Sequence, residues 1–169
     1  LADAEQMKKA ANIIKADSSR RYVVPSAPGK RFSDDIKVTD LLYKCYDLAE
    51  KGENFSEVLE EIHNRYREII SGLEMNFSID DDIKIIENNF KKRYGSNYAA
   101  SRGEYLNGKV IAAYLGFPFV DAADVIFFCE DGSLDQEKTA EARLQSGLRR
   151  LRDRARRPRP RGRRQARPG

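Results

Sequence analysis

FSEVLEEIHNRYREIISGL, residues 55–73, carries the clearest helical periodicity in the chain. Its apolar residues recur every three or four positions, which places them on one face of a helix. We expect Ser56 to cap this helix. A second helix is predicted over residues 79–92, and its first turn holds three aspartates, the charge favoured at a helix N-terminus. The sequence therefore predicts an antiparallel helical hairpin. The apolar residues of its first helix are Phe55, Leu59, Ile62, Tyr66, Ile69, Ile70 and Leu73.

Outward from this hairpin, short apolar runs alternate with further amphipathic segments. Helices are predicted over residues 2–15, from Thr39 to about Gly52, and over residues 101–115. Short β-prone runs at residues 21–24, 117–120 and 125–129 are predicted to be strands. Strands that alternate with helices are typical of an α/β domain. We therefore predict a mainly parallel sheet with the helical hairpin inserted into it. Ser133 and Gln136 are expected to cap a last helix.

Residues 141–169 differ in composition from the rest of the chain. They contain 12 arginines, no lysine and two acids, whereas the whole chain has a net charge of only +4, so residues 1–140 are acidic. We predict a disordered tail. Such a tail is either an arginine-rich arm that binds nucleic acid or out-of-frame translation of a GC-rich gene. We favour the frame error, because the change falls inside an amphipathic pattern and no aromatic residue is present to stack on bases.

The remaining composition excludes several classes of protein. Cys45 and Cys129 are too few for a disulfide framework and too far apart for a metal site, so we expect thiols in a reducing, cytoplasmic compartment. The longest apolar stretch, residues 110–125, is interrupted by Gly, Pro and Asp and does not suit a membrane span. The first residues do not resemble a signal peptide, and without an initiator Met the chain is expected to begin partway through a longer protein.

One candidate ligand site is the loop that follows the first β-prone run, VVPSAPGK at residues 23–30. Loops at the carboxyl ends of strands bind ligands in open α/β sheets. Backbone N–H groups and the Ser26 hydroxyl could contact phosphate oxygens there, with charge from Lys30 or Arg31. A plain turn is the alternative, and the spacing does not fit a Walker loop.

Thr39 and Glu104 are the second pair of candidates. Thr39 lies at the expected start of a helix, where it is either an N-cap or a hydroxyl that binds an anionic carboxylate. Glu104 follows Gly103 in the expected first turn of its helix, either as a surface acid or as a partner for a substrate ammonium. Arg102 could pair with a phosphate or an acid. His63, the single histidine, is predicted to be structural or exposed, and no nucleophile is apparent.

Three segments together resemble the aspartate kinases of the amino acid kinase family. They are VVPSAPGK at residues 23–30, VTDLL at residues 38–42 and SRGEYL at residues 101–106, and their order and separations fit. Residues 116–126 are similar to a further strand and loop of that family. The resemblance covers residues 1–140, which we predict to be an incomplete N-terminal part of a catalytic domain, with residues 141–169 as the tail.

The resemblance implies a site and a reaction. Thr39 and Glu104 would bind L-aspartate, and Ser26 would lie near the ATP phosphates. The β-carboxylate of aspartate would receive the γ-phosphate, in the presence of Mg²⁺, towards lysine, methionine and threonine. Such a transfer needs positioning and charge neutralisation rather than a protein nucleophile. A homo-oligomeric parent enzyme is implied, with no membrane partner and no nucleic acid.

The sequence also departs from the family pattern. The family's phosphate-contacting lysine stands in a Lys-Phe-Gly-Gly run that the 169 residues lack. No catalytic residue is therefore assigned, no metal ligand is assigned, and the chain alone is expected to be inactive. Two alternatives stay open at this point: an amino acid kinase that acts on glutamate or acetylglutamate, and a non-catalytic protein whose basic tail binds nucleic acid.

Overall fold

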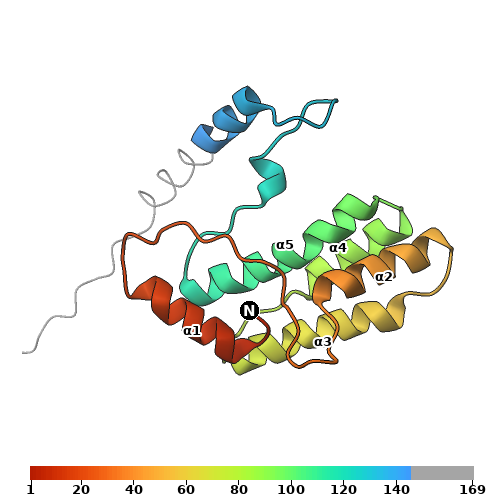
Figure 1. Cartoon of the computed structure of the whole chain (residues 1–169), viewed down its shortest axis with the longest axis horizontal. Helices are drawn as coiled ribbons and strands as arrows, with labels where there is room; N and C mark the ends of the chain where they lie inside the picture. Colours follow the sequence, from red (N-terminus) through yellow and green to blue (C-terminus); the bar gives the residue numbers. More distant parts are fainter. Residues whose placement is uncertain (146–169) are drawn as a thin grey trace, which may run out of the picture. The chain divides into compact units, whose positions relative to one another are not determined.

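The computed structural model describes residues 1–145 (Figure 1). The chain divides into two compact units, Leu1–Phe119 and Val120–Gly169. Most of the predicted arginine-rich tail, residues 146–169, lies outside the described residues. The domain boundary predicted at residues 140–141 stays a prediction.

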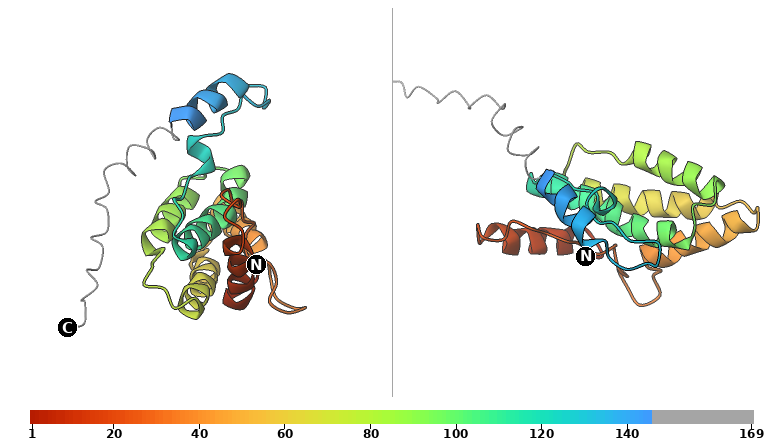
Figure 2. Two further views of the ribbon diagram at one scale, coloured as in Figure 1. Left: turned by 90° about the vertical axis from the view of Figure 1, so that its left-hand side faces the viewer. Right: turned by 90° about the horizontal axis from the view of Figure 1, so that it is seen from above.

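Unit 1 is a bundle of α-helices. α2 lies in contact with α3, α4 and α5, and α1 packs on α3 (Figures 1 and 2). The core between them contains fully buried side chains from α2 to α5, among them Leu42, Ile62, Phe90 and Leu106. The helices are α1 (Ala4–Lys15), α2 (Val38–Glu50), α3 (Ser56–Gly72), α4 (Asp80–Lys91) and α5 (Ser96–Leu115).

The helical hairpin forms where the periodicity predicts it. Ile62 and Tyr66 on α3 are completely buried, so the predicted apolar face of that helix is the one that packs. The cap differs from the prediction. Phe55 is the N-cap residue, without a capping side chain, and the Ser56 N–H donates to Asn54 Oδ1 at 2.9 Å.

The predicted α/β fold with a mainly parallel sheet is wrong for this structure. Within residues 1–145 there is no β-ladder, and the sole strand-like pairing is an isolated antiparallel bridge between Phe128 and Leu134. Tyr22 and Val24, in the first predicted strand, are 91% and 96% exposed. A β-prone run becomes a strand only when a neighbour supplies hydrogen bonds and a surface to pack on. None of the described segments supplies both to residues 21–24 or 117–120.

In unit 2 the described residues form short local structure. η1 (Ala122–Asp124) is a single 3₁₀ turn, and residues 136–145 are helical. That helix is capped by Asp135, whose carboxylate accepts from the Lys138 N–H at 2.9 Å, and not by Ser133 as predicted. Ser133 instead bonds Asp131. Among the described helices, none is both long and apolar enough to cross a bilayer.

The two cysteines occupy contrasting environments. Cys45 is completely buried on α2, and burial raises the pKa of its thiol to about 12. Cys129 is exposed in unit 2. Both are free thiols.

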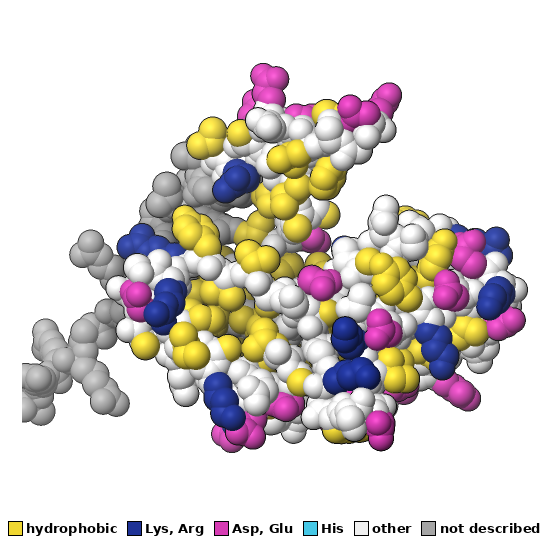
Figure 3. Space-filling view, viewed as in Figure 1, with side chains coloured by type: hydrophobic (Ala, Val, Ile, Leu, Met, Phe, Trp, Pro, Cys, Tyr) yellow, Lys and Arg dark blue, Asp and Glu magenta, His cyan; other side chains and the backbone are white. Residues whose placement is uncertain are grey.

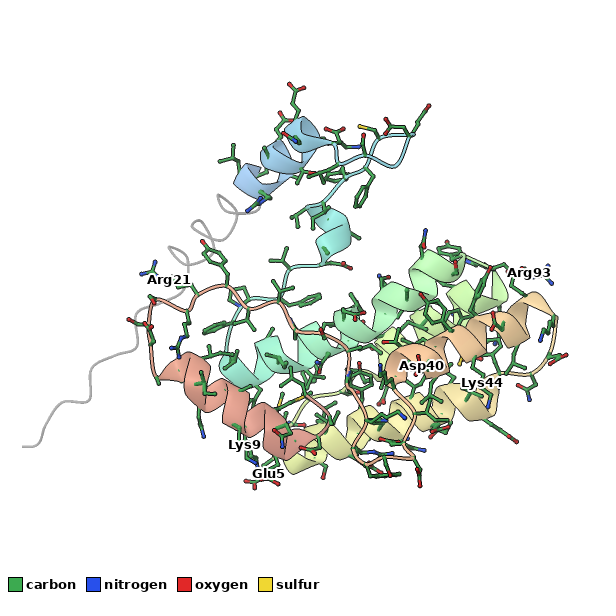
Figure 4. All side chains as sticks on the ribbon, in the orientation of Figure 1. Glu5, Lys9, Arg21, Asp40, Lys44 and Arg93 are labelled. Carbon is green, nitrogen blue, oxygen red and sulfur yellow. The ribbon has the colours of Figure 1, made fainter. Side chains whose placement is uncertain are left out.

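The outer faces of the helices carry mixed charge (Figure 3). On α1, Glu5 and Lys9 form an exposed ion pair at 2.9 Å, and Asp40 and Lys44 are exposed one turn apart on α2 (Figure 4). An exposed ion pair such as Glu5–Lys9 stabilises a fold very little. Unit 1 therefore depends on its apolar core and on a few buried polar contacts.

Candidate functional site

The candidate site is built where the segment of residues 25–29 lies against α5. Gly103 and Gly108 of that helix both face the segment. A Cβ on Gly103 would lie 2.6 Å from Ala27 Cβ, and one on Gly108 would lie 3.9 Å from Pro25 Cγ. Glycine inside a helix is unfavourable by about 1 kcal/mol relative to alanine. At Gly103 it is required, because any side chain would push the segment away.

One peptide group of this segment is bound at both of its polar atoms. The N–H of Ala27 donates to Glu104 Oε1 at 3.3 Å, and the preceding carbonyl, that of Ser26, accepts from Asn107 Nδ2 at 2.5 Å. Glu104 is exposed and Asn107 is completely buried. Glu104 stands in the middle of α5, which begins at Ser96, and not in a first turn as predicted. The helix dipole therefore does not explain its position.

Thr39 is the second residue of α2 and is half-buried. Lys37, not Thr39, is the N-cap residue, so the capping role considered for Thr39 is not found. The neighbouring Val38 is buried, and its Cγ1 lies 3.7 Å from where a Gly103 Cβ would stand. Val38 and Gly103, which adjoin Thr39 and Glu104 in the chain, thus pack together. The convergence of the Thr39 and Glu104 side chains on one ligand stays a prediction.

The loop between Ser26 and Thr39 is closed by Arg65 of α3. This buried guanidinium donates to the carbonyl oxygens of Gly29 and Ile36, at 2.7 Å for Ile36, and its Nη2 lies 3.0 Å from Asp35 Oδ2. Arg31 also binds the Asp35 carboxylate, at 2.9 and 3.0 Å. Hydrogen bonds from Arg31 and the charge of Arg65 hold the pKa of Asp35 far below its usual range.

Tyr66 connects α3 to the same part of α5. Its hydroxyl donates to the Gly103 carbonyl at 2.8 Å, and the side chain is completely buried. Burial raises its pKa well above the ordinary value. Tyr66 is therefore a neutral donor that fixes the helix position beside the segment.

The other basic candidates are engaged elsewhere. Lys30 donates to the Ser33 carbonyl, and Arg31 pairs with Glu68 as well as Asp35. Arg102 lies over the rings of Tyr98 and Tyr105, 4.5 and 4.7 Å from their centroids, a cation–π arrangement.

His63 is buried, and its Nε2 lies 2.7 Å from Asp80 Oδ1 at the start of α4. This contact joins the two helices of the hairpin. It fits the structural role predicted for His63.

An open depression of about 690 Å³ lies over α3, away from the three predicted site residues. Glutamates outnumber arginines in its lining, so it repels a polyphosphate. We therefore do not assign the nucleotide to it. Its lining residues are Arg31, Ser56, Glu57, Glu60, Glu61, Asn64, Arg65 and Glu68.

Comparison with known proteins gives a consistent result. No protein-family model matches the chain. Aspartokinase 3 of Bacillus subtilis (strain 168) is 36% identical over 129 residues, which are 72% of this chain and 28% of that protein. The crystal structure of Clostridium acetobutylicum aspartate kinase superposes with a TM-score of 0.83 at 44% identity, covering 88% of this chain and 34% of that one. This chain belongs to the aspartate kinases. It spans about a third or less of the length of the aspartate kinases that it matches.

Sequence reasoning missed two residues of this aspartate kinase segment, Arg65 and Asn107. A signal for each was present. Arg65 lies three residues after Ile62 and four before Ile69, within the apolar face of α3, and Asn107 likewise precedes Val110 by three. A polar residue at a core position must find a partner, and here both side chains donate to loop carbonyls, while Arg65 also pairs with Asp35.

Proposed function

We propose that this chain supplies the aspartate-binding part of an aspartate kinase site. In this proposal Glu104 binds the α-ammonium of L-aspartate, Thr39 donates to a substrate carboxylate beside the N-terminus of α2, and Ser26 lies near the ATP phosphates. Glutamate or acetylglutamate kinases gain no support from the comparisons, whose relatives are aspartate kinases.

One observation carries the proposal. The three segments that resemble the family meet at Gly103, because its Cα faces Ala27 of the first segment and Val38 and Leu42 of the second. Residues separated by more than 60 positions are thereby brought to one place. An exposed carboxylate, a helix N-terminus and a loop with an exposed serine are suited to a small zwitterion and a phosphate.

The reaction requires no protein nucleophile. An oxygen of the aspartate β-carboxylate attacks the γ-phosphorus, and a new P–O bond forms. The bond from that phosphorus to the β–γ bridging oxygen breaks, and ADP departs with the electron pair. The product is an aspartyl β-phosphate, the precursor of lysine, methionine and threonine. The role of Glu104 and Thr39 is to hold the carboxylate in line.

The loop chemistry suits ATP more than a tightly held metal. Ser26 is exposed and offers a hydroxyl to phosphate oxygens. Within residues 1–145, no group of His, Cys, Asp and Glu is arranged to hold a metal ion. Mg²⁺ usually binds through substrate phosphates and few protein ligands. We therefore propose that Mg²⁺ arrives with ATP. Homo-oligomeric assembly and a cytoplasmic location are further parts of this proposal.

The proposal is tested by titrating the full chain with L-aspartate and following backbone amide shifts by NMR. We expect shifts around Thr39 and Glu104, weakened about 10- to 100-fold in affinity by Glu104→Gln, because a charged hydrogen bond is lost. Glu50→Gln, an exposed glutamate of α2, is the matched control and should bind normally. Equal binding of L-glutamate, or no effect of Glu104→Gln, would refute the proposal.

A further inference from the structure

Asn107 has no role in the proposed function, and its side chain is only half satisfied. It is completely buried on α5, and its Nδ2 donates to the Ser26 carbonyl at 2.5 Å. Its Oδ1 accepts no hydrogen bond within the part of the chain that the structure describes. This orientation of the amide follows from chemistry, because the reverse would place two acceptor oxygens against each other.

A buried acceptor without a donor is unfavourable, and an apolar side chain of equal volume would avoid it. Asn107 therefore does not stand in the core for stability. What the amide provides is a single directed donor, aimed at one backbone carbonyl of the candidate phosphate loop.

Asn107 and Glu104 act on the same peptide group. Glu104 accepts its N–H and Asn107 donates to its C=O, from positions one helical turn apart. The N–H and C=O of a peptide group point in opposite directions within its plane, so hydrogen bonds to both of them fix the rotation of that plane. The orientation of the Ser26–Ala27 peptide is then set by α5 and not by the loop itself.

We propose that Asn107 is a positioning residue, which together with Glu104 locks the orientation of the Ser26–Ala27 peptide for ligand binding. This inference rests on the proposed function, since it assumes that Ser26 and Glu104 bind ligand. Glu104 then has two tasks. Oε1 holds the loop, and Oε2 is directed to the substrate ammonium, so loop geometry and aspartate binding are coupled through one carboxylate.

The proposal separates stability from binding. Asn107→Leu keeps the number and branching of the side-chain heavy atoms, removes the donor and also removes the unpaired acceptor. We expect a folded protein whose urea unfolding midpoint is unchanged or higher. We also expect aspartate affinity to fall by about tenfold, which corresponds to one misplaced hydrogen-bonding group. Hydrogen exchange of the Ala27 N–H should become faster, because the peptide is free to rotate.

Three measurements on the full chain decide the matter. The first is the urea midpoint, the second is L-aspartate affinity by NMR titration, and the third is amide exchange at Ala27 without ligand. A parallel loss of stability and affinity in Asn107→Leu, with unchanged exchange at Ala27, would show a merely structural residue and overturn the proposal. Unchanged affinity would overturn it as well.

The wild-type chain provides a test that survives a misfolded variant. The side-chain NH₂ protons of Asn107 should be protected from exchange and should shift when aspartate is added. Free exchange of these protons contradicts the proposal. Failure of the proposed function gives a different result. In that case the wild-type chain shows no NMR shifts when aspartate is added, while the Ala27 N–H and the Asn107 NH₂ protons remain protected from hydrogen exchange.

Discussion

Arg65 and Asp35 form a buried ion pair, 3.0 Å from Nη2 to Oδ2, with 3% and 5% of their side chains exposed. The pair joins α3 to the loop between residues 29 and 36, and Arg65 also binds the carbonyl oxygens at both ends of that loop. The helical hairpin therefore holds the segment that precedes Thr39. Because a buried charge needs its partner, the contact is sensitive to the loss of either side chain.

Arg65→Met is expected to lower the free energy of unfolding by about 3–5 kcal/mol, because it removes one of the two arginines that bind the buried Asp35 carboxylate and leaves the Gly29 and Ile36 carbonyl groups without this donor. Arg67→Met is the matched control. Arg67 lies on the same helix, is about half exposed and contacts the side chains of Glu60, Asn64 and Asp80, so its loss should cost less than about 1 kcal/mol. Urea unfolding followed by circular dichroism measures both. Equal losses in the two variants would contradict the buried-pair interpretation.

Acid should destabilise the protein through Asp35. Its pKa is lowered in the folded state, whereas in the unfolded chain it is about 3.9. The unfolded state therefore takes up the proton first. The stabilisation is fully present above about pH 4 and is lost as the pH falls toward the folded pKa.

Asp35→Asn tests this prediction. It should be less stable than wild type at neutral pH, and the difference should shrink below about pH 4 as the wild-type carboxylate becomes protonated. Asp34→Asn, at the exposed neighbouring position, is the control. The measurement is the urea midpoint against pH. A constant difference across the acid range would rule out the assigned role of Asp35.

Gly103→Ala should displace the loop at Ala27, because the new methyl group would stand 2.6 Å from the Ala27 Cβ. Overpacking of this kind costs about 1–3 kcal/mol. The double variant Gly103→Ala/Ala27→Gly exchanges the two side chains and should recover most of the loss. Gly29→Ala is the control. A Cβ added to Gly29 would have no heavy atom within 4 Å apart from its own chain neighbours, so this substitution should be neutral. Thermal unfolding of wild type, Gly103→Ala, Ala27→Gly and the double variant gives the coupling, and additive losses would contradict a direct contact.

The helices of unit 1 could be predicted from the sequence because their signal is local. On α3 the apolar positions repeat with the helical period, and Ile62 and Tyr66 are buried as that period requires. Cap residues were predicted less well. Ser56 and Ser133 have suitable side chains, but Asn54 and Asp135 make the hydrogen bonds at those ends.

The predicted sheet could not be judged from short runs alone. Residues 21–24 have strand propensity. That propensity describes how well side chains suit a half-buried pleated surface, and it does not supply the neighbouring strand that a sheet requires. The site shows the same limit. Ser26, Thr39 and Glu104 stand in recognisable segments, whereas the contacts of Arg65 and Asn107 join residues 36 and 81 positions apart. Such contacts depend on tertiary packing. Their only trace in the sequence is a polar residue at a position that belongs to the apolar face of a helix.

The placement of the two thiols gives each unit its own chemical reporter. A disulfide reagent can reach Cys129 in the native protein, but it reaches Cys45 only when α2 leaves the helical bundle. Labelling kinetics at Cys45 would therefore time the opening of unit 1 alone, with no engineered probe. A fall in the Cys45 labelling rate on addition of a ligand would measure how strongly that ligand stabilises the bundle against opening.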